Sequence, residues 1–98
     1  MIVLAIDEGT TGTRCICYDR DQRPVSSAGL EFTQYYPQPG WVEHDAEEIW
    51  EATREAASRA LREGGISPEE VAAVGITNQR ETAVVWERST GRPVRKAI

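Results

Sequence analysis

The first segment whose residues could do chemistry is a polar link, Asp7–Arg14, which follows an apolar run at the start of the chain. Gly9 and Gly12 let the backbone approach an anion closely and turn its N–H groups toward it. The threonines between and after them offer hydroxyl donors, and Arg14 offers a positive charge for phosphates. Asp7 could hold Mg²⁺ directly or through water. The link is therefore a candidate phosphate site, and on spacing alone the alternative, a hairpin that simply favours Gly and Thr, is slightly favoured.

A second polar link, Thr77–Thr82, lies between two apolar segments. Arg80 can donate hydrogen bonds to substrate oxygens, and Glu81 can accept from substrate hydroxyls, which is the chemistry of a polyol site. The alternative is an exposed turn with a surface ion pair. On the local sequence alone the exposed turn is favoured, because loops are polar by default.

A third segment, Tyr35–Asp45, gathers Tyr, Trp and Pro. It could form an apolar wall for a ligand or an interface, but aromatic residues are more often core, so a structural role is favoured. His44 is interpreted as a local hydrogen-bond partner and not as a catalyst. Cys15 and Cys17 are predicted to pack in the core as reduced thiols, without binding a metal.

Length and charge limit the classes of partner. The chain has 98 residues and a formal net charge of −5, which allows one domain. The acidic balance argues against nucleic acid or an anionic membrane as the main partner. No membrane span and no signal peptide are predicted, and with reduced cysteines this favours a cytoplasmic location. The sequence leaves the oligomeric state open.

The elements that must position these links follow from hydrophobic periodicity and turn signals. Three strands in an antiparallel meander are predicted over Met1–Ile6, Thr13–Tyr18 and Val25–Phe32. A helix should begin after an N-cap at Asp45, with Glu48 completing a capping box, and end at Gly64-Gly65.

A single helical turn is predicted at Ser67–Glu70, followed by a buried strand at Val71–Thr77. A further strand is predicted at Thr82–Trp86, and one more could begin at Pro93–Ile98. The order β-β-β-α-β-β predicts an α/β fold, a mixed sheet with helical cover.

Three segments together resemble a known family. They are Ile6–Arg14, Tyr36–Asp45 with the following Glu48-Ile49-Trp50, and Gly75–Thr82 with Val85-Trp86 and Thr90-Gly91. The first resembles the phosphate loop of carbohydrate kinases that share the actin and hexokinase ATPase fold. The other two are more specific and resemble glycerol kinases. The resemblance runs along essentially the whole chain, in order and with matching gaps.

The resemblance implies the first part of an RNase H-like domain and the transfer of the ATP γ-phosphoryl group to glycerol, giving sn-glycerol 3-phosphate. ATP and Mg²⁺ are the implied cofactors. Asp7 would serve the Mg²⁺ and phosphate region, and Arg80 and Glu81 would bind glycerol hydroxyls. The residues implied at the nucleotide phosphates are Thr10, Thr11, Gly12 and Arg14.

Two residues depart from the family pattern. Glu8 stands where glycerol kinases usually carry Gln, so its added charge is expected to point away from the phosphates. Gly12 stands where Ser is common, so only backbone contact is expected there. Neither change affects Arg80 or Glu81.

The chain is shorter than the family, so we expect residues 1–98 to be the N-terminal part of the first RNase H-like domain. The rest of the kinase chain would then be its partner. No catalytic residue is expected within it. The general base and the adenine pocket would lie beyond Ile98, leaving the fragment inactive alone. The alternatives are a kinase for another polyol or sugar, or a non-catalytic module that binds nucleotide or protein. The kinase interpretation requires both polar links to lie at the same edge of one sheet.

Overall fold

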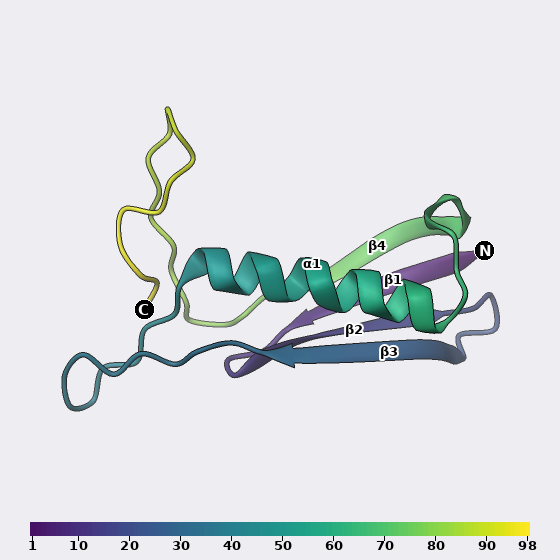
Figure 1. Cartoon of the computed structure of the whole chain (residues 1–98), viewed down its shortest axis with the longest axis horizontal. Coiled ribbons are helices and arrows are strands. Elements are labelled where there is room, and N and C mark those ends of the chain that lie inside the picture. The colour runs from purple at the N-terminus through teal and green to yellow at the C-terminus, as the bar shows by residue number, and fades with distance from the viewer.

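The sheet has four strands, and the computed structural model describes it together with the rest of residues 1–98. Its strands are β1 (Ile2–Glu8), β2 (Gly12–Tyr18), β3 (Pro24–Glu31) and β4 (Val71–Thr77), in the order β3-β2-β1-β4. The first three strands form the predicted antiparallel meander, and β4 pairs with β1 in parallel. The predicted α/β class with a mixed sheet is confirmed (Figure 1).

One helix, α1 (Ala46–Glu63), crosses a face of this sheet (Figure 1). Its predicted N-cap is confirmed, because the Glu47 backbone N–H donates to Asp45 Oδ1 at 2.9 Å. The predicted capping box is wrong, because Glu48 instead accepts a hydrogen bond from the Tyr35 hydroxyl. At the other end Gly65 has φ +63°, and Ile66 N–H bonds back to Leu61 O at 2.9 Å. These contacts form a Schellman ending, in which glycine adopts the left-handed conformation without steric cost.

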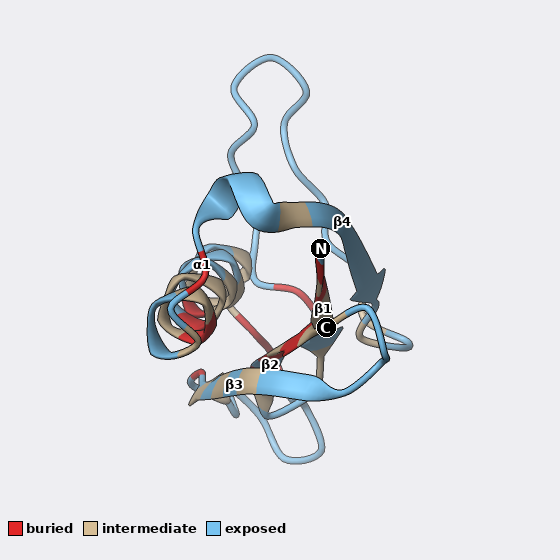
Figure 2. Cartoon of the chain, turned by 90° about the vertical axis from the view of Figure 1, so that its right-hand side faces the viewer, coloured by how far each residue is buried: buried red, intermediate tan, exposed pale blue.

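The core lies between α1 and the centre of the sheet (Figure 2). Small residues at the contact let the helix lie close to β2 and β3, and the Ser26 hydroxyl donates to Ala60 O at 2.7 Å. The core residues are Ile2, Leu4, Cys15, Cys17, Ala56, Ala60 and Ile66. Both cysteines are fully buried and free, as predicted.

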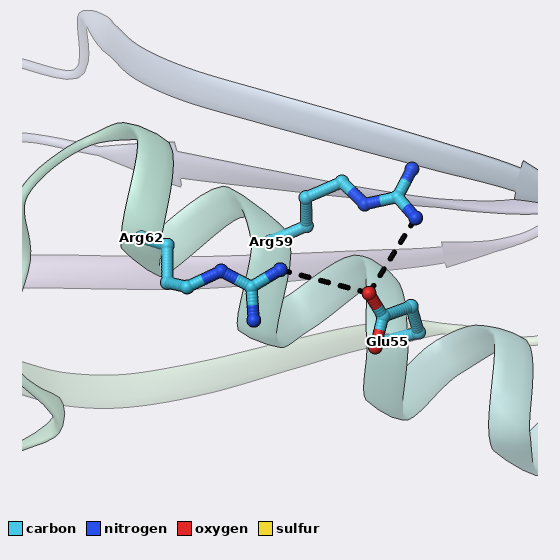
Figure 3. A network of polar contacts seen from close by, with 3 residues as sticks. All are labelled: Glu55, Arg59 and Arg62. Atoms are coloured by element: carbon cyan, nitrogen blue, oxygen red, sulfur yellow. Dashed lines mark hydrogen bonds and ion pairs between the residues drawn. The ribbon is translucent and has the colours of Figure 1, made fainter.

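The outer face of α1 is charged. Glu55 Oε1 lies 3.4 Å from Arg59 Nη2 and 3.6 Å from Arg62 Nη2, one turn and two turns further along the helix (Figure 3). Such exposed pairs each contribute roughly 0–1 kcal/mol, so they mark the solvent side of the helix more than they stabilise it. No helix in the structure is long and apolar enough to cross a membrane.

The two strands predicted at Thr82–Trp86 and Pro93–Ile98 do not form. These residues instead make an extended arm that folds back on itself and stands away from the sheet (Figure 1). Its backbone bonds are isolated, such as Val94 N–H to Val85 O at 2.8 Å. The prediction fails because β-forming residues make a strand only when a neighbouring strand pairs with them. No strand of the sheet pairs with this arm. The predicted helical turn is confirmed as η1 (Pro68–Glu70).

Candidate active site

Both polar links lie at one edge of the sheet. Since β1 and β4 run in parallel and pair Asp7 with Thr77, the residues that follow them leave the sheet at the same end (Figure 1). The first link, Gly9–Gly12, turns into β2. The second, Asn78–Thr82, leads into the extended arm. The geometric condition set by the sequence is therefore met.

The first link is a tight backbone corner. Gly9 N–H donates to Gly12 O at 2.9 Å, and a Cβ placed on Gly9 would lie 2.9 Å from that same carbonyl. A Cβ on Gly12 would lie 2.6 Å from Leu30 O in β3. The two glycines are thus required by close backbone approach, and they leave Thr10 and Thr11 exposed at the tip of the corner.

Asp7 and Arg14 lie beside each other on adjacent strands. They are partners in the β1–β2 register and are both exposed. Because side chains alternate along a strand, they project from the face opposite to the one that carries Cys15 and packs on α1. A carboxylate and a guanidinium therefore border the same open face, next to the glycine corner.

Glu8 lies on the helix side of the sheet. Its carboxylate accepts hydrogen bonds from the Thr13 hydroxyl at 3.0 Å and from the Thr53 hydroxyl of α1 at 2.6 Å. It therefore points away from the face that carries Asp7. Burial, the Glu8 charge and Cys17, in that order of effect, raise the pKa of the Cys15 thiol to about 11.

The second link presents Arg80 and Glu81 to solvent. Glu81 has φ +59°, the left-handed region that non-glycine residues seldom occupy, and such strain concentrates at binding sites. The surface ion pair of the alternative interpretation is not formed, since no ion pair involves Arg80 or Glu81. Both charged groups are free to meet a ligand.

The aromatic segment forms a hairpin beside this edge. Tyr35 and Glu43 exchange two backbone hydrogen bonds of 2.9 and 2.8 Å, which close the loop between them. Tyr36 and Trp41 remain exposed, so the favoured interpretation of these aromatic residues as core is wrong for both. His44 is buried and is a hydrogen-bond partner, as predicted, but its partners Gln34 and Gln79 are distant in sequence.

An open, largely apolar groove of about 440 Å³ lies next to the second link. It runs between the first turns of α1 and the end of β4, and Trp50 and Ile76 expose large side chains there. No group of three or more His, Cys, Asp or Glu side chains could hold a metal ion by itself.

The sequence matches the family described as "FGGY family of carbohydrate kinases, N-terminal domain" over residues 2–98. It is 55% identical over 96 residues to glycerol kinase 2 of Thermotoga maritima and 57% identical over 96 residues to the glycerol kinase of a Roseiflexus species. Both matches cover 98% of this chain and 19% of the relative, so the chain spans about a fifth of the length of these proteins.

Solved structures give the same result. A xyloylose kinase from Brucella ovis superposes with a TM-score of 0.92 at 26% identity, covering 100% of this chain and 20% of that one. A Plasmodium falciparum glycerol kinase with ADP superposes with a TM-score of 0.85 at 34% identity, covering 99% and 20%. Family match and fold agree along the whole chain, which therefore belongs to the FGGY family of carbohydrate kinases.

Proposed function

We propose that this chain forms the N-terminal segment of an ATP-dependent glycerol kinase, which transfers the γ-phosphoryl group of ATP to glycerol and yields sn-glycerol 3-phosphate. The observation that carries the proposal is the meeting of two chemically different links at one sheet edge, fixed by the Asp7–Thr77 pairing. The identities of 55–57% to proteins named glycerol kinase support this substrate.

The first link would take the nucleotide phosphates. Its corner would offer the backbone N–H of Gly12, the exposed hydroxyls of Thr10 and Thr11, and the exposed Arg14 charge two residues beyond Gly12. Mg²⁺ would arrive with ATP as part of the substrate. A single carboxylate suits it, because Mg²⁺ keeps several waters and is often held by one carboxylate plus substrate phosphates. Asp7 is that carboxylate, since Glu8 is engaged on the other face.

The second link would take glycerol. The Arg80 guanidinium donates and the Glu81 carboxylate accepts, so together they can satisfy adjacent hydroxyls of a triol. Neither group has an internal ion-pair partner to displace. An analogue without a hydroxyl would leave one of them unpaired, which is how such sites gain specificity.

The remaining apparatus would come from the rest of the kinase. Phosphoryl transfer needs in-line geometry and exclusion of water by closure, and both links are open to solvent in this chain. We propose that residues 1–98 contribute no general base and do not turn over alone. The two free, buried cysteines suit the reducing cytoplasm.

The test is Arg80→Ala in the full-length enzyme that carries this chain, assayed by coupled ADP release with glycerol and MgATP. Glycerol binding should weaken by roughly 2–4 kcal/mol, because charge-assisted hydrogen bonds are lost, while the KM for ATP stays near its original value. The matched control is Arg88→Ala, an exposed arginine in the arm without an ion pair. Equal glycerol affinity in both variants would refute the polyol role.

A sugar in place of glycerol is the alternative substrate, and one observation supports it, the TM-score of 0.92 to a xyloylose kinase. Glycerol compared with xylulose, ribulose and gluconate, at matched concentrations, separates the two. We expect glycerol to have the highest kcat/KM. A higher kcat/KM for a sugar would show that the enzyme is a kinase for that sugar and not for glycerol. Saturable ATP binding with no turnover of any acceptor would instead support a non-catalytic module.

A further inference from the structure

The backbone at His44 is held by hydrogen bonds to a segment on each side. Tyr35 and Glu43 exchange two hydrogen bonds, so Gln34 and His44 follow as the next opposed residues of the hairpin. On its other side His44 exchanges two backbone bonds with Ala97, of 2.8 and 2.7 Å. The imidazole is buried, with the Phe32 ring edge-on at 5.1 Å. The position of the residue that carries the ring is therefore fixed by the fold.

One ring nitrogen of His44 connects through hydrogen bonds to the Gly9–Gly12 corner. Gln34 Nε2 donates to Thr10 O at 2.9 Å, so its amide oxygen must face the other way, toward His44. That oxygen lies 2.7 Å from His44 Nε2. Because an amide oxygen only accepts, His44 Nε2 carries the proton.

The other ring nitrogen connects to the second link. In a neutral imidazole protonated at Nε2, Nδ1 is an acceptor, and Gln79 Nε2 lies 2.8 Å from it. The same amide nitrogen donates to Thr82 Oγ1 at 2.8 Å, and the Thr82 hydroxyl donates to Arg80 O at 3.4 Å. An unbroken chain of hydrogen bonds thus joins the backbone of Thr10 to the backbone of Arg80.

We infer that His44 is a positioning residue that sets the separation between two segments. They are the Gly9–Gly12 corner, proposed to take the phosphates, and the Asn78–Thr82 link, proposed to take the polyol. The catalytic consequence of this positioning rests on the proposed function. Gln79 Oε1 is buried without a hydrogen-bond partner, so the contacts of the amide nitrogen with His44 and Thr82 are the ones that hold this side chain. Without the imidazole acceptor, the amide should turn over and the Asn78–Thr82 link should shift.

The first test reads the tautomer directly and needs no substrate. The chain has a single histidine, so its ring nitrogens are assigned without ambiguity in a long-range ¹H–¹⁵N spectrum. A protonated Nε2 and an unprotonated Nδ1 are expected. A protonated Nδ1, or the averaged signal of two exchanging tautomers, would overturn the inference.

The second test interrupts each half of this series of hydrogen bonds separately. The amide of His44→Gln can reach the Nε2 position and keep the Gln34 contact, whereas the amide of His44→Asn can reach the Nδ1 position and keep the Gln79 contact. Backbone amide shifts in the 98-residue chain should therefore move mainly at Asn78–Thr82 in the first variant and mainly at Gly9–Gly12 in the second. Phe32→Leu is the control, because it loosens packing on the ring without removing a polar contact. Identical shift patterns in all three variants would refute a two-sided link.

The third test is kinetic, in the full-length enzyme. Both His44 variants should lower kcat with glycerol and MgATP about tenfold or more, with both KM values within about threefold, because each substrate keeps its own link while their relative position is lost. Phe32→Leu should keep kcat per folded molecule. Unchanged kcat in the His44 variants would overturn the inference even if wild type is a glycerol kinase. A wild type that fails to phosphorylate glycerol would refute the proposed function instead, and the spectra would still decide the link.

Discussion

At the residue scale, the glycine corner shows how backbone geometry constrains the amino acid at a candidate phosphate site. The Gly9 backbone lies so close to the Gly12 carbonyl that a methyl group must displace one of them. Gly9→Ala should lower the free energy of unfolding by about 1–3 kcal/mol, as overpacking usually does, and should also weaken nucleotide binding. Urea denaturation of the chain measures the first effect. Gly75→Ala is the matched control, since a Cβ there meets nothing within 4 Å, and it should be neutral or slightly stabilising.

The buried thiol predicts a pH dependence at the same scale. Because the pKa of Cys15 is raised to about 11 in the folded state, folding favours the protonated thiol. The contribution of the protonated thiol to the free energy of unfolding is complete below the unfolded-state pKa, near 9. It falls by about 2–3 kcal/mol as the pH rises toward 11. Hydrogen bonding to Glu48 raises the pKa of Tyr35 as well, so the comparison must isolate the thiol. Thermal unfolding of wild type and Cys15→Ala between pH 8 and about pH 11 should converge as pH rises; parallel curves would contradict the assignment.

At the element scale, the end of α1 depends on one backbone conformation. Gly65 has φ +63°, and a Cβ added there would meet nothing within 4 Å, so Gly65→Ala should cost about 1–2 kcal/mol through backbone strain alone. Gly65→Asn should recover part of the loss, because Asn tolerates the left-handed region better. Chemical denaturation followed by helical circular dichroism measures both. Equal stability of the alanine variant would show that the helix end can rearrange freely.

Elements were predictable from the sequence where local chemistry decides them. Turn residues and runs of apolar and β-forming residues identified the meander, and Asp45 identified the start of α1. The signals failed where a distant partner decides: Glu48 bonds Tyr35 instead of closing its own helix turn, and Val84-Val85-Trp86 find no neighbouring strand. The candidate site likewise has parts that local sequence predicts and a part that it does not. Its two links have the composition of their predicted chemistry, whereas the Gln34–His44–Gln79 connection joins residues far apart in the sequence and has no local pattern.

At the scale of the whole molecule, α1 covers only part of the sheet. It packs on β2 and β3, whereas β4 at the opposite edge exposes nearly all its residues (Figure 2). Val74 and Ile76 face the helix side in register with Leu4 and Ile6, and α1 leaves both of them exposed. An edge strand with exposed apolar side chains and free backbone groups is a template for pairing with another chain.

This uncovered edge predicts self-association of the 98-residue chain. Ile76 is 70% exposed, so Ile76→Lys should remove an apolar contact and add charge repulsion without disturbing the core. Sedimentation velocity should show oligomers for wild type and a larger monomer fraction for the variant, with little change in Tm. Val25→Lys, at an exposed valine on the other edge strand β3, is the control and should leave the oligomers intact. If wild type is monomeric throughout, β4 is no association surface; if both variants dissociate the oligomers equally, net charge and not the β4 edge governs them.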